Sequence, residues 1–101
     1  MSQIVLIAKI TTQPGRRAEA VDAFQPLLDH AETEQGTLTY RLHEDANDAD
    51  TLWMYEVYSD QAALDAHRAS DTMKTAGRAL GQLLAGAPEL TYLTAIGGTP
   101  L

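Results

Sequence analysis

Cysteine is absent from the sequence, which excludes disulfide bonds, thiolate nucleophiles and cysteine-ligated metal sites. Basic residues are scarce as well, since 7 Lys and Arg stand against 14 Asp and Glu and leave a net charge of −7. Nucleic acids and anionic membranes both attract clustered positive charge, so this balance argues against either as a partner. The simpler explanation of the acidity is that it keeps the protein soluble.

Long apolar segments and cofactor motifs are missing too. The apolar run over residues 4–10 is too short to cross a membrane and follows no basic region, so it indicates a strand and a cytoplasmic protein. There is no Gly-rich phosphate loop and no Ser-His-Asp order, and the histidines (His30, His43 and His67) are scattered over different segments. We therefore expect no metal and no dedicated cofactor.

What is present is an alternation of strand and helix patterns. Strands are predicted over 4–10, 37–44, 51–58 and 89–96, and helices over 16–35, 60–68 and 70–85. This order is typical of an α+β ferredoxin-like βαββαβ fold with a four-stranded antiparallel sheet, whose first and third strands are central. No linker or repeat interrupts it. We expect a single domain over residues 1–101, with a core over about 4–96 and a tail over 97–101.

One face of this sheet is predicted to pair with a second copy of the chain. The helices can cover one face only, and the other face carries Val5, Ile7, Trp53, Tyr55 and Val57, which are too apolar for water. A chain of this length buries only somewhat more than about 60% of its unfolded surface, so a partner subunit would add stability. We expect a homodimer that forms sheet to sheet.

The segment 51–67 carries the sharpest candidate site. Glu56 lies on an otherwise apolar strand face, where an unpaired carboxylate would cost several kcal/mol. His67 follows on a helix that folds back over this strand and is the nearest candidate partner. Beside a cavity, such a pair would form a general base near neutral pH. The alternative is a buried pair that only holds the helix to the strand.

Other residues on the helix-facing side are candidates for substrate binding. The hydroxyls of Tyr40, Tyr58 and Tyr92 would orient a phenolic substrate, with core packing as the alternative, and Met54 shares their face. Gly77 costs roughly 1 kcal/mol within a helix relative to Ala. Opposite the small Ala8, it indicates a hollow for a flat organic molecule or, equally, close packing of helix on sheet.

Three motifs resemble one known family. They are the aromatic strand with Glu56 followed by residues 59–67 (SDQAALDAH) and 69–74 (ASDTMK), the turn 14–17 (PGRR), and the segment 34–40 (EQGTLTY). In this order and spacing they resemble the antibiotic biosynthesis monooxygenase family of small dimeric proteins, over about residues 4–96. Three positions depart from that pattern, which most often has Pro, Cys and Trp where this sequence has Gln35, Thr37 and Tyr58. The branch of the family to which the chain is most similar therefore stays open.

The resemblance implies a dimeric αβ-barrel and a cofactor-independent monooxygenase. Such an enzyme would oxidise a small aromatic, quinol or anthrone-like, with dioxygen, using His67 as base or orienter and Glu56 as its partner. A small-molecule isomerase on the same fold remains an alternative, as does a non-catalytic ligand-binding or stress-associated dimer. Likeness of fold alone does not choose among them.

Overall fold

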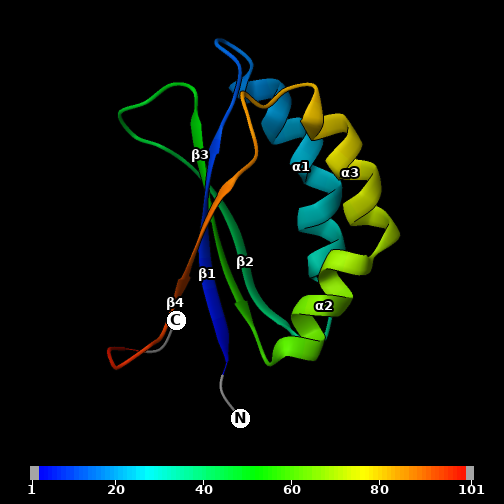
Figure 1. Cartoon of the computed structure of the whole chain (residues 1–101), viewed down its shortest axis with the longest axis vertical. Coiled ribbons are helices and arrows are strands. Elements are labelled where there is room, and N and C mark those ends of the chain that lie inside the picture. The colour runs from blue at the N-terminus through cyan, green and yellow to red at the C-terminus, as the bar shows by residue number, and fades with distance from the viewer. Residues whose placement is uncertain (1–2, 100–101) are drawn as a thin grey trace.

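The structure, a computed structural model, describes residues 3–99 and forms a sheet with helices on one side (Figure 1). Its elements in chain order are β1 (Ile4–Thr11), α1 (Arg17–Ala31), β2 (Thr37–Glu44), β3 (Thr51–Tyr58), α2 (Gln61–Ala69), α3 (Asp71–Gly81) and β4 (Glu89–Leu93). The sheet is antiparallel with the order β2-β3-β1-β4. The predicted ferredoxin-like fold is therefore confirmed, with β1 and β3 in the centre.

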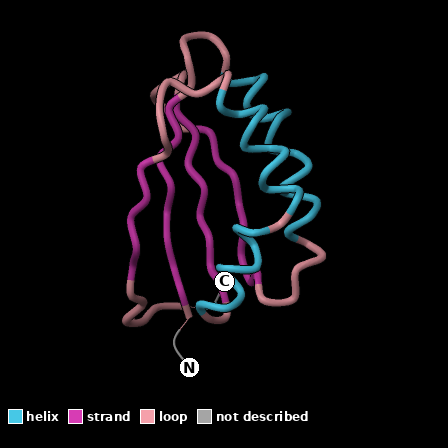
Figure 2. Tube along the Cα trace, turned by 45° about the vertical axis from the view of Figure 1, so that its right-hand side comes forward, coloured by secondary structure: helices cyan, strands magenta, loops and turns pink. Residues whose placement is uncertain are grey.

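All three helices cover the same face of the sheet. In Figures 1 and 2, α1 and α3 run side by side along the upper part of the sheet, and α2 lies at its lower end. The helices pack mainly over β2 and β3. The main core lies beneath α1 and α3 and is formed by Ala8, Ile10, Ala20, Phe24, Leu27, Leu52, Met54, Ala76, Leu80 and Leu83. No helix among residues 3–99 has the length and apolar content needed to cross a membrane.

Two polar side chains set the boundaries of α2 and α3. The Asp60 carboxylate accepts the Ala63 N–H at 2.8 Å and begins α2. Ser70 ends α2, and its hydroxyl accepts the Met73 N–H at 3.1 Å to begin α3. The chain therefore turns within one residue, which places α2 and α3 over different parts of the sheet.

Several elements are shorter than the sequence predicts. The last strand ends at Leu93, which pairs with Val5 close to the start of β1, so the following residues have almost no strand left to pair with. Ile96, expected within this strand, is fully exposed. Residues 97–99 have no regular structure, and the rest of the expected tail lies outside the described residues.

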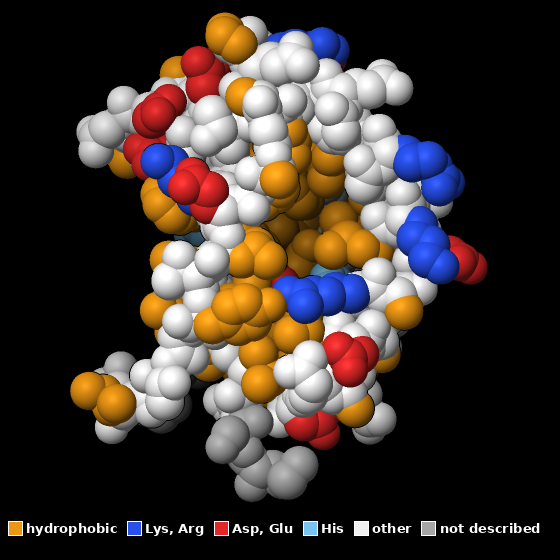
Figure 3. Space-filling view, viewed as in Figure 1, with side chains coloured by type: hydrophobic (Ala, Val, Ile, Leu, Met, Phe, Trp, Pro, Cys, Tyr) orange, Lys and Arg blue, Asp and Glu red, His pale blue; other side chains and the backbone are white. Residues whose placement is uncertain are grey.

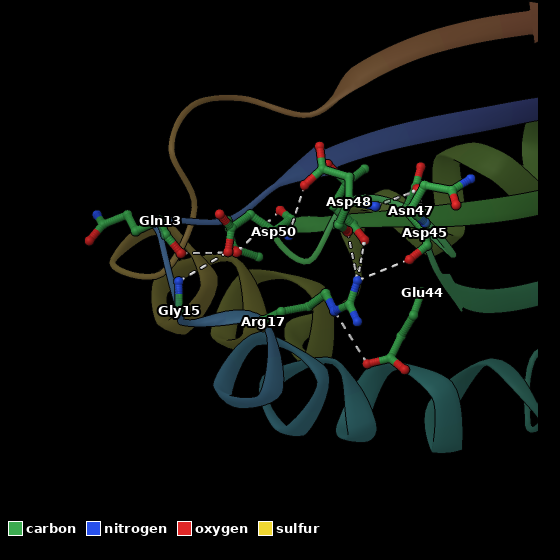
Figure 4. A network of polar contacts seen from close by, with 10 residues as sticks. Gln13, Gly15, Arg17, Glu44, Asp45, Asn47, Asp48 and Asp50 are labelled. Atoms are coloured by element: carbon green, nitrogen blue, oxygen red, sulfur yellow. Dashed lines mark hydrogen bonds and ion pairs between the residues drawn. The ribbon is translucent and has the colours of Figure 1, made fainter.

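The loop between β2 and β3 is held by one arginine (Figure 4). Arg17 donates to the backbone carbonyls of Asp45 and Asp48 at 3.1 and 2.8 Å and pairs with the Glu44 carboxylate at 3.3 Å. The Asp50 carboxylate accepts the Gly15 N–H at 3.0 Å. Arg17 therefore connects the start of α1 to this loop.

The open face of the sheet is only partly exposed in the single chain. Val5 and Val57 are buried, with 8% and 6% of their surface exposed, whereas Ile7, Trp53 and Tyr55 are partly buried. The Trp53 indole donates to the Asp45 carboxylate at 2.8 Å and lowers the pKa of that carboxyl, and the Lys9 ammonium lies 5.9 Å from the Trp53 ring centre. This face thus presents aromatic rings bordered by charge.

Candidate functional site

A cavity of about 430 Å³ lies between the sheet and α3. Figure 3 shows it as a hollow lined by hydrophobic side chains near the middle of this view of the molecule. Its lining residues are Ala8, Ile10, Phe24, Leu27, Tyr40, Met54, Glu56, Met73, Gly77, Leu80, Gly81, Leu84, Gly86, Ala87, Pro88 and Leu90. The volume lies within the range of small-molecule sites, and the lining is almost entirely apolar.

Small residues on both walls leave this space open. Gly77 and Gly81 lie one turn apart on α3, and a Cβ added at either would meet no atom within 4 Å. Ala8 lies across the cavity on β1. The hollow predicted from Gly77 and Ala8 is therefore present, and the alternative of close helix-to-sheet packing at Gly77 is wrong.

Glu56 and Tyr40 are the polar side chains of the lining. Burial raises the pKa of the Glu56 carboxyl, because water no longer stabilises its charge, and a hydrogen bond from Tyr58 and the nearby His67 partly oppose the rise. That hydrogen bond runs from the Tyr58 hydroxyl to Glu56 Oε1 at 2.5 Å. Burial also raises the pKa of Tyr40, with further contributions from the negative charges of Glu56 and Glu34. Tyr40 therefore stays a neutral phenol that can donate a hydrogen bond.

His67 is buried behind the cavity rather than in its lining. It lies on α2 with 1% of its surface exposed, and its Nδ1 is 2.7 Å from Oε1 of Glu34. Its ring centre is 4.9 Å from that of Tyr40 and 5.4 Å from that of Tyr58. The sequence had suggested Glu56 as its partner. The structure corrects this: Glu34, 33 residues away in the chain, makes the hydrogen bond, and Glu56 is bonded to Tyr58 instead.

The predicted substrate-binding residues divide into two groups. Ala8, Tyr40, Met54 and Gly77 all line the cavity. Tyr58 and Tyr92 are not among its lining residues. Tyr58 is fully buried against Glu56, whereas Tyr92 is 54% exposed and accepts a hydrogen bond from Arg68 at 2.5 Å. Tyr92 is exposed because the helices pack over β2 and β3, while β4 forms the opposite edge of the sheet.

Glu34 is the site residue that the sequence analysis missed. It stands at the start of the segment 34–40, whose resemblance to a family motif marked the stretch without assigning this carboxylate a partner. Among residues 3–99, no group of three or more His, Asp or Glu side chains is placed to hold a metal ion. The cavity thus offers one ionisable carboxyl, one phenol and a flat apolar lining.

Comparison with known proteins gives consistent matches. Residues 3–79 match the antibiotic biosynthesis monooxygenase family. A Bacillus subtilis (strain 168) protein named "Putative monooxygenase YcnE" is 36% identical over 64 residues, which are 63% of this chain and 67% of that protein.

Solved structures match over nearly the whole chain. A protein of Caulobacter crescentus CB15, named as a "putative antibiotic biosynthesis monooxygenase", superposes with a TM-score of 0.89 and 32% identity, over 95% of this chain and 92% of that one. PA3566 from Pseudomonas aeruginosa superposes with a TM-score of 0.88 and 28% identity, over 96% and 97% of the two chains. The fold, the motifs and the family match agree, and the chain belongs to the antibiotic biosynthesis monooxygenase family.

Proposed function

We propose that this protein is a cofactor-independent monooxygenase that oxidises a small aromatic substrate, quinol or anthrone-like, with dioxygen. The observation that carries this proposal is the apolar cavity of about 430 Å³ with the Glu56 carboxyl in its lining. A flat aromatic molecule fits such a cavity, and its acidic proton would meet the carboxyl there. The family membership supports the same reaction class.

Glu56 is the base in this proposal. Burial raises the pKa of its carboxyl, which makes its carboxylate a stronger base than an exposed one. The carboxylate removes one proton from the acidic carbon or hydroxyl of the substrate, and the resulting anion donates an electron to dioxygen. The family resemblance implies that His67 is the base or the orienter, but His67 lies behind the lining, so in this proposal it acts through its neighbours.

The atoms of the reaction balance without a further reductant. A carbon–oxygen bond forms between the substrate radical and the reduced oxygen, giving a peroxide. The O–O bond then breaks while the substrate loses its second hydrogen as a proton, and both protons leave with one oxygen atom as water. Overall, a CH₂ group and O₂ become a carbonyl and H₂O. The protein supplies orientation, a base and an apolar cavity.

The remaining residues of the site position the substrate. The Tyr40 phenol, kept neutral by its raised pKa, donates to a substrate oxygen. Ala8, Met54 and Gly77 contact the faces of the aromatic rings. Tyr58 acts through its hydrogen bond to Glu56, and Tyr92 orients Arg68 at the surface.

Oxygen uptake tests this function directly. We expect the purified protein to consume dioxygen with a quinol or an anthrone. The product should be 14 mass units heavier than the substrate under ¹⁶O₂ and 16 mass units heavier under ¹⁸O₂, as the conversion of CH₂ to a carbonyl with one oxygen atom from dioxygen requires. A product of unchanged mass formed without oxygen would instead identify an isomerase. Tight binding without turnover over the whole panel would identify a ligand-binding protein.

We also propose a homodimer formed through the open face of the sheet. The observation behind it is the apolar and aromatic surface of Ile7, Trp53 and Tyr55, which the helices leave uncovered. Trp53→Arg would place a charge in that interface, at a cost of several kcal/mol. We expect light scattering to detect monomer or aggregate for this variant and an intact dimer for Ala79→Arg, an exposed position on α3. An unchanged dimer for Trp53→Arg would remove the interface assignment.

A further inference from the structure

A series of polar side chains connects the cavity with the surface near the turn between α1 and β2. Glu56 lies in the lining, and its Oε1 accepts the Tyr58 hydroxyl at 2.5 Å. The Tyr58 ring packs against His67, whose Nδ1 bonds to Glu34 Oε1 at 2.7 Å. The other oxygen of Glu34 is 3.6 Å from Nε2 of His30, whose side chain is 35% exposed. We call these five residues the polar chain.

The hydrogen bond from Glu34 defines which nitrogen of His67 is free. An ionised carboxylate only accepts hydrogen bonds, so Nδ1 of His67 carries the hydrogen and Nε2 keeps its lone pair. This Nε2 atom is buried and has no hydrogen-bond partner among the described residues. Buried ring nitrogens without a partner are uncommon, because each forfeits its bond to water. The lone pair at Nε2 is therefore available for a proton.

Polar and charged groups surround the ring of His67. The ring contacts Glu34 from the turn after α1, Tyr40 from β2 and Tyr58 from β3. Glu56 on β3 is close enough for its charge to interact with that of the ring, and Arg68 adjoins His67 on α2. Two of these groups are carboxyls, and Glu34 bonds the ring directly. Arg68 is exposed, and its guanidinium is bonded to the Tyr92 hydroxyl. A positive charge on the ring would thus be stabilised at Nδ1 by the Glu34 carboxylate.

We propose that Glu34 is a positioning residue, which holds His67 in the Nδ1–H tautomer so that Nε2 serves as a second proton acceptor behind Glu56. This inference rests on the proposed function. The proton that the Glu56 carboxylate removes from the substrate passes on to Nε2 of His67, which restores the carboxylate and leaves an imidazolium paired with Glu34. The same proton returns to the reduced oxygen, which leaves as water. His30 lies between Glu34 and solvent, and the polar chain exchanges protons with solvent there between turnovers.

The first test needs no substrate. In ¹⁵N NMR of the wild-type protein, we expect the neutral ring of His67 to be protonated at Nδ1 and unprotonated at Nε2. Glu34→Gln keeps an oxygen that accepts the Nδ1 hydrogen but removes the charge beside the imidazolium, so the titration of His67 should move to lower pH. Glu32→Gln removes the same charge from an exposed position two residues away and serves as the control. A wild-type ring protonated at Nε2, or a titration unchanged in Glu34→Gln, would overturn the proposal.

The second test uses turnover. Because Glu34→Gln keeps the hydrogen bond but removes the negative charge that stabilises the imidazolium, it should lower kcat by about tenfold or more and leave KM within about twofold. The acid limb of the kcat profile should move to lower pH in Glu34→Gln and stay in place in Glu32→Gln. A loss confined to KM, or equal losses in the two variants, would contradict a positioning role.

The two tests separate this inference from the proposed function. If no panel substrate consumes oxygen but the NMR results are as expected, the proposed function fails and the positioning of His67 by Glu34 stands. If oxygen is consumed but His67 has the other tautomer, the function stands and the role of Glu34 is wrong.

Discussion

The two ends of the helix-covered face of the sheet are built differently. At one end, α2 lies close to the sheet over a small cluster of Leu6, Tyr58 and Leu64, with almost no surface exposed. At the other end, α3 presents Gly77 and Gly81 to Ala8, and the space between them stays open. Both ends use the same strands, since Leu6 and Ala8 are neighbours on one face of β1.

The comparison shows that side chains are closely packed at the α2 end and leave a cavity at the α3 end. Gly36 illustrates the closeness at the packed end, because a Cβ there would lie 2.4 Å from the Ala63 Cβ. At the hollow end, the glycines of α3 meet nothing within 4 Å and still carry the helix-propensity cost of glycine, roughly 1 kcal/mol each. Glycine is thus required by contact at one end, whereas at the other it maintains empty space. Glu56 lies at the boundary, facing the cavity and bonded to Tyr58 of the packed end.

The largest effect on activity is expected from substituting Glu56 and His67, which lie where the two ends meet. Glu56→Gln removes the proposed base and His67→Ala the group behind it, and each should lower kcat on a true substrate by about 10²-fold or more. The double variant should be little worse than either, since groups that act as one unit are non-additive. Steady-state oxygen uptake measures the effect.

Stability has to be followed in the same variants. Removing His67 from its pair could cost about 3 kcal/mol, which would mimic a loss of activity by unfolding. Asp65→Asn, an acid-to-amide change at an exposed position on α2, is the control and should keep full activity. A folded His67→Ala protein with unchanged kcat would show that His67 is structural.

At the packed end, Gly36→Ala should be destabilising. The added methyl would lie 2.4 Å from the Ala63 Cβ, and overpacking of this kind costs about 1–3 kcal/mol. Urea unfolding measures the change. The double variant Gly36→Ala with Ala63→Gly removes the clash and should recover part of the loss, less the cost of a helical glycine. If Gly36→Ala alone is neutral, α2 does not lie as close to the turn as described.

At the hollow end, the same type of substitution should have the opposite effect on stability. Gly77→Ala and Gly81→Ala meet no neighbouring atom, so each should stabilise the fold by roughly 1 kcal/mol through helix propensity. Each methyl also occupies part of the cavity, so binding of a flat aromatic ligand should weaken. Chemical denaturation and calorimetric titration measure the two effects. Improved stability with unchanged binding would show that the glycines do not shape the ligand site.

The smallest effect is expected from pH. The folded-state pKa of Glu56 is raised above its unfolded value, so the folded protein binds the proton more tightly. Its contribution to stability is complete below the unfolded pKa and is lost as pH rises through the folded pKa. Glu56→Gln has no such loss, so the Tm difference between variant and wild type should shift in favour of the variant over this range. A constant difference would show that the carboxyl is not desolvated in the folded protein.

The sequence alone determined the arrangement of the sheet and gave the hollow as one of two alternatives. The order of the strand and helix patterns along the chain identified β1 and β3 as the central strands of a ferredoxin-like sheet. The cavity was one prediction from two small residues on facing elements, Ala8 and Gly77, and both line it. Small side chains on a strand and on the helix above it leave unfilled space between them. These inferences depend on local periodicity and residue size, which the sequence states directly.

Only the tertiary structure decided which polar groups meet. Periodicity correctly placed Glu56 and His67 on faces directed toward each other's elements, but it could not reveal that Glu34, 33 residues before His67, lies nearer to the ring. In the same way, Tyr92 has the strand phase of a core residue and is exposed, because the helices pack mainly over β2 and β3 and β4 lies at the opposite edge of the sheet. The physical reason is that side-chain direction follows from local backbone geometry, whereas a hydrogen-bond partner depends on how distant segments are positioned in space.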